Sequence, residues 1–162
     1  MTMKRSILGA LIVLASFTAS AAAQDFKQYR TTTLDALVDE WNRKTSKEGP
    51  GYSFSRPEKL KLIVKLGQAP KPCETDPLRL VLRTMGFEKV LEQVKVSQCI
   101  GLVSDGGRAM PAYVQDVLVD GLNADAKVGR SIEAYVDFLA FEVNADRSRN
   151  RAILMLNRFE PL

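Results

Sequence analysis

The residue types that most often carry out enzyme chemistry are scarce in this chain. Its 162 residues include no histidine and only two cysteines. Without histidine there is no Ser–His–Asp or Cys–His arrangement, no imidazole metal ligand and not the commonest general base. Two thiolates supply half of a tetrahedral zinc site, and completing such a site with carboxylates is uncommon. We therefore predict neither a metal site nor a cofactor.

Carboxylates are the remaining candidates for catalysis, because a glycosidase needs only a pair of them. Six of those in the C-terminal third of the chain are candidates: Asp105, Asp116, Asp120, Asp125, Asp137 and Glu142. No spacing among them selects a pair, and each also fits a turn or a solvated strand face. The segment from Asp120 to Asp125 lacks the alternating ligands and closing glutamate of a calcium loop. The chain is therefore not expected to be an enzyme.

Aromatic and basic side chains in the same third of the chain suit binding better than catalysis. The candidate ligand-binding residues are Tyr113, Tyr135, Arg108, Arg147 and Arg149. Such a surface would suit a glycan, an anionic lipid head group or another envelope protein. The competing interpretation is that the aromatic rings belong to the core and that the arginines only solubilise a turn.

The N-terminal residues 1–23 have the features of a secretory signal peptide. Lys4 and Arg5 precede an apolar run, and alanines and a serine with small-x-small spacing follow it. We predict cleavage between Ala23 and Gln24, and a location in the periplasm or outside the cell. The alternative is an uncleaved anchor, although the run is only just long enough to span a membrane.

The charge of the exported chain gives no reason to expect a nucleic-acid partner. Without Lys4 and Arg5 it carries 21 basic and 19 acidic residues, a net charge of +2. This excess is too small to indicate nucleic-acid binding. With the signal peptide removed, no membrane span is expected, and possible partners are an envelope protein, a glycan or a lipid head group.

The two cysteines, Cys73 and Cys99, predict a disulfide. An even number of cysteines in an exported chain favours pairing. Neither the CxxC spacing nor the electropositive surroundings of a redox-active thiol are present. Two free buried thiols are the alternative.

Two segments of the N-terminal half have helical periodicity, and one segment between them alternates as a strand does. Residues 31–47 are predicted to be a helix, with Leu34, Leu37, Val38 and Trp41 on one face and Thr32 as its N-cap. Residues 59–66 are predicted to be a strand whose lysines suit a sheet edge. Residues 52–57 are predicted to be a loop, residues 67–77 a connector, and residues 77–93 a helical segment, with a strand as the alternative.

Residues 94–159 are predicted to be rich in β-strands. Asp105, Gly106 and Gly107 supply a hairpin turn between two strands, which explains these glycines better than a phosphate-binding loop does. Residues 122–128 are predicted to be a connector, and residues 132–143 a long strand that is bent or buried on both sides.

These strands predict an α+β fold class with two packed helices. Four or five strands, one much longer than the others, suit a small antiparallel β-barrel, OB-like or SH3-like, with a curled sheet as the second choice. Residues 24–162 are expected to form a single domain. Because fold does not determine function, we expect only an exported, non-enzymatic binding or interaction module of the bacterial cell envelope. The alternative is a carboxylate-dependent hydrolase acting on envelope polysaccharide.

Overall fold

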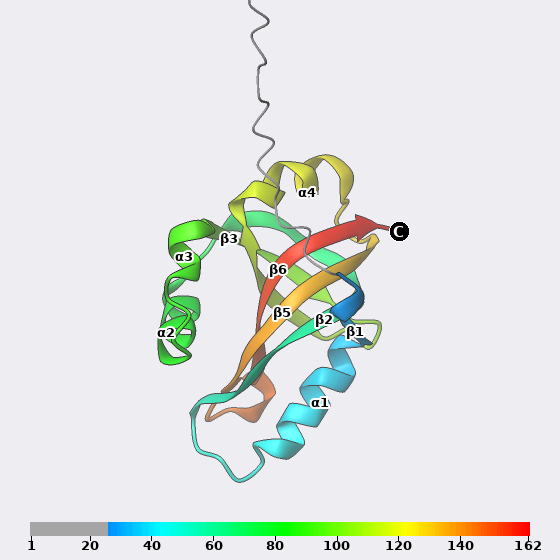
Figure 1. Ribbon diagram of the computed structural model, residues 1–162. Helices are drawn as coiled ribbons and strands as arrows, with labels where there is room; N and C mark the ends of the chain where they lie inside the picture. The colour runs from blue at the N-terminus through cyan, green and yellow to red at the C-terminus, as the bar shows by residue number, and fades with distance from the viewer. Residues whose placement is uncertain (1–25) are drawn as a thin grey trace, which may run out of the picture.

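The computed structural model describes residues 26–162, so the predicted signal peptide and its cleavage site lie outside the described residues. The chain is a mixed α+β protein with a six-stranded sheet (Figure 1). The strands are β1 (Arg30–Thr32), β2 (Gly51–Pro72), β3 (Val96–Val103), β4 (Ala109–Gln115), β5 (Ser131–Val143) and β6 (Arg151–Pro161). The helices are α1 (Leu34–Lys44), α2 (Asp76–Thr84), α3 (Val90–Gln93) and α4 (Val119–Asp125).

The sheet curls until its hydrogen bonds form a ring. The strand order is β1-β2-β3-β4-β6-β5, and β2 also pairs with β5. The 22-residue β2 makes this possible, because its first two-thirds pair with β5 and its last third pairs with β3. The ring has one narrow junction: β4 and β6 run parallel and pair only at Tyr113 with Met155 and at Val114 with Leu156.

Helix α1 packs its apolar stripe into the interior of the curled sheet. Leu34, Leu37, Val38 and Trp41 are all buried there. The Trp41 ring lies 5.0 Å from that of Phe138 of β5, between ring centroids. The helical periodicity of the sequence therefore predicted the correct buried face of this helix.

The bounds of α1 differ from the expected 31–47. Its N-cap is Thr33, whose hydroxyl accepts a hydrogen bond of 3.1 Å from the Ala36 amide. Thr32 instead belongs to β1, which pairs in parallel with β2 from Leu60 to Leu62. At the other end, the Thr45 hydroxyl donates to the Trp41 carbonyl, and the helix ends at Lys44.

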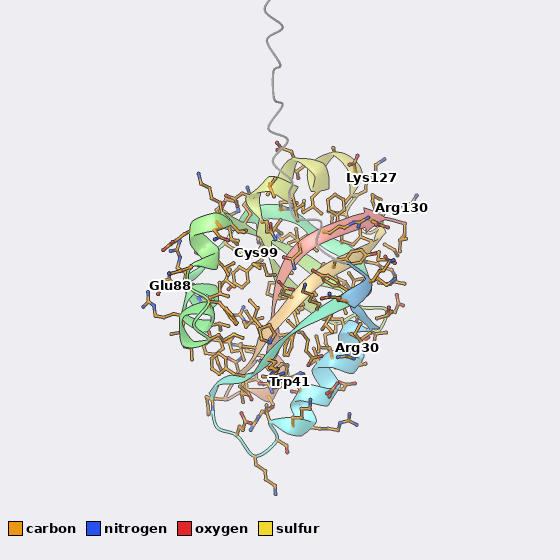
Figure 2. The ribbon with its side chains drawn as sticks, viewed as in Figure 1. Arg30, Trp41, Glu88, Cys99, Lys127 and Arg130 are labelled. Carbon is orange, nitrogen blue, oxygen red and sulfur yellow. A yellow bond between two sulfur atoms is a disulfide. The ribbon has the colours of Figure 1, made fainter. Side chains whose placement is uncertain are left out.

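A second apolar cluster lies on the outer face of the sheet, beneath α2. Leu78, Val81 and Leu82 of this helix are buried against residues of β3, β4, β5 and β6. The predicted disulfide between Cys73 and Cys99 is present, with 5.7 Å between the Cα atoms. It links the segment before α2 to β3, and Figure 2 shows Cys99 beside α2 and α3.

Four sequence expectations were wrong in whole or in part: the loop at 52–57, the edge lysines of 59–66, the connector at 67–77 and the connector at 122–128. Residues 52–57 and 67–72 belong to β2, in which Pro57 and Pro70 lie at bulges and Pro72 is the last residue. The lysines at 59–65 do not mark an edge. There β2 pairs with β5 on one side and with β1 on the other over Leu60–Leu62, so the lysines mark the outer face. Finally, α4 replaces part of the expected connector and buries Leu122.

β2 and β3 approach each other closely at Gly101. A Cβ atom there would lie 2.9 Å from Cβ and 3.2 Å from the backbone nitrogen of Gln68. Replacing Gly101 with alanine should therefore lower the free energy of unfolding by about 1–3 kcal/mol, as overpacking does. Urea unfolding followed by Trp41 fluorescence measures this loss. A Cβ atom on Gly49 would meet no other atom within 4 Å, so Gly49→Ala is the control and should change stability little.

No helix within residues 26–162 is long and apolar enough to cross a membrane.

Candidate functional site

Two adjoining cavities form a groove where β4 and β6 diverge. One, of about 420 Å³, lies beside the disulfide, between the end of β2 and strands β3 and β4. The other, of about 460 Å³, lies between α1, the start of β4 and residues 147–151. Both cavities are lined by Ala109, Met110, Pro111 and Arg151, so they are two parts of one depression. We call it the seam groove, and its parts the disulfide end and the arginine end.

The groove exists because the parallel pairing of β4 with β6 stops early. Continuing the register from Tyr113 and Met155 would place residues 109–112 opposite residues 151–154, but the strands do not pair there. Instead, the backbone N–H of Ala152 points at the thioether sulfur of Met110, 3.3 Å away. Sulfur is a weak acceptor, so this contact is a poor substitute for a strand-to-strand hydrogen bond.

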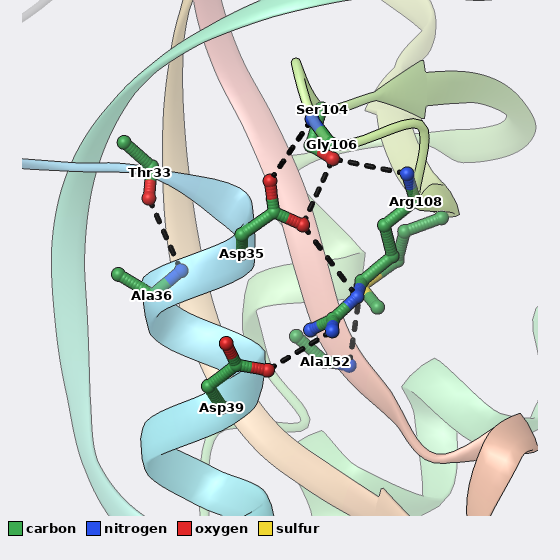
Figure 3. A network of polar contacts seen from close by, with 9 residues as sticks. Thr33, Asp35, Ala36, Asp39, Ser104, Gly106, Arg108 and Ala152 are labelled. Atoms are coloured by element: carbon green, nitrogen blue, oxygen red, sulfur yellow. Dashed lines mark hydrogen bonds and ion pairs between the residues drawn. The ribbon is translucent and has the colours of Figure 1, made fainter.

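Helix α1 holds the two loops that border the arginine end. The first is the turn at residues 104–108. The Ser104 hydroxyl donates to the Asp35 carboxylate over 2.9 Å, and the Gly106 amide donates to the same carboxylate over 3.3 Å (Figure 3). Arg108 reaches from the turn to Asp39, one helical turn further along, over 2.9 Å. The Asp-Gly-Gly sequence thus forms the expected hairpin turn, with Gly107 at φ +83°.

The second loop, residues 144–150, is held at the other end of α1. Asn150 is buried and donates from its side-chain amide to Asn42 over 2.8 Å. Arg147 donates to the Thr45 carbonyl over 3.1 Å and also to the carbonyls of Ser46 and Glu48. These carbonyls follow the last turn of α1, where a cation is favoured.

Four of the five predicted binding residues line the seam groove, but they differ in what they can offer a ligand. Arg147 binds main-chain carbonyls and Arg108 binds two aspartates of α1, so both hold loops in place. Arg149 is 80% exposed, and its contact in the structure is a 3.4 Å ion pair with the exposed Asp146, a weak kind of interaction. Tyr113, at the disulfide end, is 6% exposed.

Around Tyr113 the disulfide end contains both acidic and basic groups. Burial raises the pKa of the Tyr113 hydroxyl, and the charges of Arg151, Glu142 and Glu74 also act on it. Arg151 is ion-paired with Glu142, its partner across β5 and β6. Three further residues of the groove lining were not predicted from the sequence: Lys71, Met110 and Arg151. The alternation of β4 and β6 gave no indication that these strands separate.

Tyr135 lies away from the groove, on the outer face of β5. Its hydroxyl donates to Glu133, and this hydrogen bond raises the pKa of Tyr135 to about 12 and lowers that of Glu133. The Tyr135 ring packs edge-on against Tyr29, with 5.4 Å between centroids, and under the guanidinium of Arg158. It therefore does not share a site with the other four predicted residues.

Asp137, a half-buried residue near Tyr29, is expected to make the stability of the fold depend on pH. Burial raises the pKa of Asp137, and Asn157 and Lys59 only partly oppose this. A carboxyl group with a raised folded-state pKa favours folding when it is protonated, and this contribution is lost as the pH rises through that pKa. Asp137→Asn should therefore raise the urea midpoint at pH 7.

The gain from Asp137→Asn should shrink as the pH falls and disappear below the ordinary aspartate pKa of 3.8. The exposed turn residue Asp105, replaced by asparagine, serves as the control and should shift the midpoint little at either pH. A gain from Asp137→Asn that is the same at pH 3 and pH 7 would contradict the prediction.

Among residues 26–162, no three Cys, Asp or Glu side chains gather as metal ligands would. Searches against models of protein families, against curated proteins and against solved structures found no match for this chain.

Proposed function

We propose that the protein is an exported, non-enzymatic binding module of the cell envelope and that the seam groove is its ligand-binding surface. The observation that carries the proposal is the arrangement of the groove itself. Two loops far apart in sequence are fastened to one helix, and they border an open depression lined by the 80% exposed Arg149. A rigid scaffold that presents loops beside a concave surface is the usual construction of a binding site.

The strand order supports an OB-like interpretation of the curled sheet over an SH3-like one. OB-folds are five-stranded, partly open Greek-key barrels. They bind ligands on strands 2 and 3 and on the loops that join strands 1 to 2 and 4 to 5. If β2 is counted as the first strand, the corresponding surface consists of β3, β4 and residues 73–95 and 144–150. The seam groove lies on this surface, although the analogy concerns fold alone.

Export is supported by two features of different kinds. The first is the pattern of residues 1–23, which has the basic start, apolar run and small residues of a signal peptide. The second is the disulfide between Cys73 and Cys99, since disulfides persist in oxidising compartments such as the periplasm.

Site-specific photo-crosslinking tests the proposal directly. Benzoylphenylalanine would replace Ala109, which is exposed and lines both ends of the groove, in the protein expressed in its own envelope. Irradiation should give a discrete adduct, identified by mass spectrometry. Val128, an exposed apolar residue in the loop between α4 and β5, is the control position and should give none. No adduct at position 109, or the same adduct at both positions, would refute the proposal.

One observation favours a second candidate, a carboxylate-dependent hydrolase of envelope polysaccharide. Glu74 lines the disulfide end, and Glu142 and Glu74 both act electrostatically on the hydroxyls of Tyr52 and Tyr113. A glycosidase needs two carboxylates near one bond. Assay of the purified protein on isolated envelope polysaccharide tests this candidate. Hydrolysis that falls at least a hundredfold in Glu74→Gln and Glu142→Gln would favour the enzyme, and the absence of hydrolysis would rule against it.

A further inference from the structure

We propose that the ligand of the seam groove is an extended, acidic polypeptide segment that displaces Met110 and adds as a strand to the edge of β6 that β4 leaves unpaired. This inference rests on the proposed function, because it assumes that the groove binds a ligand. It adds the chemical class of the ligand and the manner in which it is held.

The backbone of β6 lacks a partner strand along one side at the groove. Between residues 151 and 154, β6 pairs with β5 on one side and lacks strand pairing with β4 on the other. The N–H of Ala152 points to this unpaired side, where its acceptor is the Met110 thioether, and Ala152 itself is 1% exposed. An incoming peptide carbonyl is a much better acceptor than a thioether sulfur. Addition of a strand to an exposed sheet edge is a recurring mode of peptide recognition.

The side chain that fills the gap between β4 and β6, that of Met110, is of an adaptable type. Methionine is unbranched, and its side chain adapts readily to a new neighbour. Met110 is 3% exposed and packs in the interior core, so an incoming strand has to displace its side chain from Ala152. Pro111 beside it has no N–H, so β4 cannot complete its own ladder at that position. The gap is thus closed by one adaptable side chain rather than by main-chain pairing.

The charge of the groove lining is mainly positive. The lining of the groove includes five cationic side chains and one carboxylate, Glu74. Arg108, Arg147 and Arg151 are used in loop or strand contacts. Of the two other cations, Lys71 at the disulfide end is exposed, and Arg149 at the arginine end is 80% exposed and ion-paired with the exposed Asp146. Between them lies an apolar floor of Ala109, Met110 and Pro111. A strand with acidic residues toward its two ends and apolar residues between them complements this pattern.

The shortage of exposed aromatic rings distinguishes a polypeptide from other anionic ligands. Single-stranded nucleic acids bind by stacking bases on aromatic side chains, and sugar rings stack on aromatic faces in a similar way. The aromatic residue in the groove lining is Tyr113, which is 6% exposed and packed under α2. The groove therefore lacks a stacking platform but has a main-chain donor, the N–H of Ala152.

Selection from a random twelve-residue peptide library displayed on phage, with the disulfide-bonded protein as the target, tests the inference. We expect enrichment of sequences in which Asp or Glu flanks an alternating apolar segment. A synthetic copy of an enriched peptide should shift the backbone amide resonance of Ala152 and the methyl resonance of Met110. No enrichment, enriched peptides without acidic residues, or binding that leaves the Ala152 amide unchanged would overturn the inference.

Charge reversal provides the matched control. The double variant Lys71→Glu and Arg149→Glu changes two exposed groove cations and should weaken peptide binding at least tenfold. The variant Lys65→Glu and Lys127→Glu makes the same change in net charge at exposed positions outside the groove, and should retain binding within about twofold. Equal weakening by both variants would overturn the inference.

The two proposals can fail separately. If crosslinking at position 109 captures a glycan or a lipid and the peptide library gives no enrichment, the groove is a binding surface but its ligand is not a polypeptide. If position 109 captures nothing, the binding proposal itself fails.

Discussion

Replacing Trp41 with alanine is expected to lower the free energy of unfolding by about 4 kcal/mol, because it empties the centre of the interior core. Trp41 is 4% exposed and packs against two phenylalanines of β5, Phe138 at 5.0 Å and Phe141 at 5.9 Å between ring centroids. The loss would affect more than packing. The same helix holds the turn at 104–108 and the loop at 144–150, so loosening α1 should also disorder the arginine end of the seam groove.

Trp41 is the only tryptophan in the chain, so unfolding of this variant must be followed by circular dichroism. The control is Trp41→Phe, which keeps an aromatic ring at the position. It also removes the indole N–H, which is buried without a hydrogen-bond partner among residues 26–162. This variant should lose less than half as much stability as Trp41→Ala. A loss below about 1 kcal/mol for the alanine variant would contradict the packing argument.

Reduction of the disulfide is expected to cost about 3.5 kcal/mol. Cys73 and Cys99 are 26 positions apart, and closing a loop of that size in the unfolded chain accounts for this value in the chain-entropy model. Urea unfolding with and without reductant, followed by Trp41 fluorescence, measures the effect. The double variant Cys73→Ala and Cys99→Ala should match the reduced protein and should not respond to reductant.

Breaking the disulfide should also alter binding, because both cysteines line the disulfide end of the groove. We expect reduction to weaken the peptide binding proposed above while leaving the arginine end in place. An unfolding midpoint that does not change on reduction would show that the crosslink adds nothing to stability.

The sequence predicted the elements whose signals are local. The stripe of Leu34, Leu37, Val38 and Trp41 repeats with helical spacing, and those four side chains are the buried face of α1. The cysteine pair was equally easy to interpret, because the predicted export of the chain and an even number of cysteines favour a disulfide. The Asp-Gly-Gly turn followed from the need for a positive φ angle at Gly107.

The sequence did not show the features that depend on distant pairing. Pro57, Pro70 and Pro72 argued against a strand, but Pro57 and Pro70 lie at bulges of β2 and Pro72 is its last residue. The groove could not be predicted from the sequence either. Arg108 and Arg149 are brought into one groove lining by contacts of α1 with residues 69 to 108 positions away. Periodicity reports which face of an element is buried and not which loops a helix will hold together.

The pairing of β2 with β5 bears on when this protein can fold. Gly51 lies opposite Val143 and Lys65 lies opposite Ser131. β2 therefore cannot pair with β5 until most of the chain is present. Sheets built from such distant pairs fold slowly, because the cost of closing long loops comes before the contacts that repay it. β6, the last strand, then completes the ring between β4 and β5. If the chain is exported as proposed, its sheet cannot close while only the N-terminal end has crossed a membrane, and it closes once β6 has crossed as well.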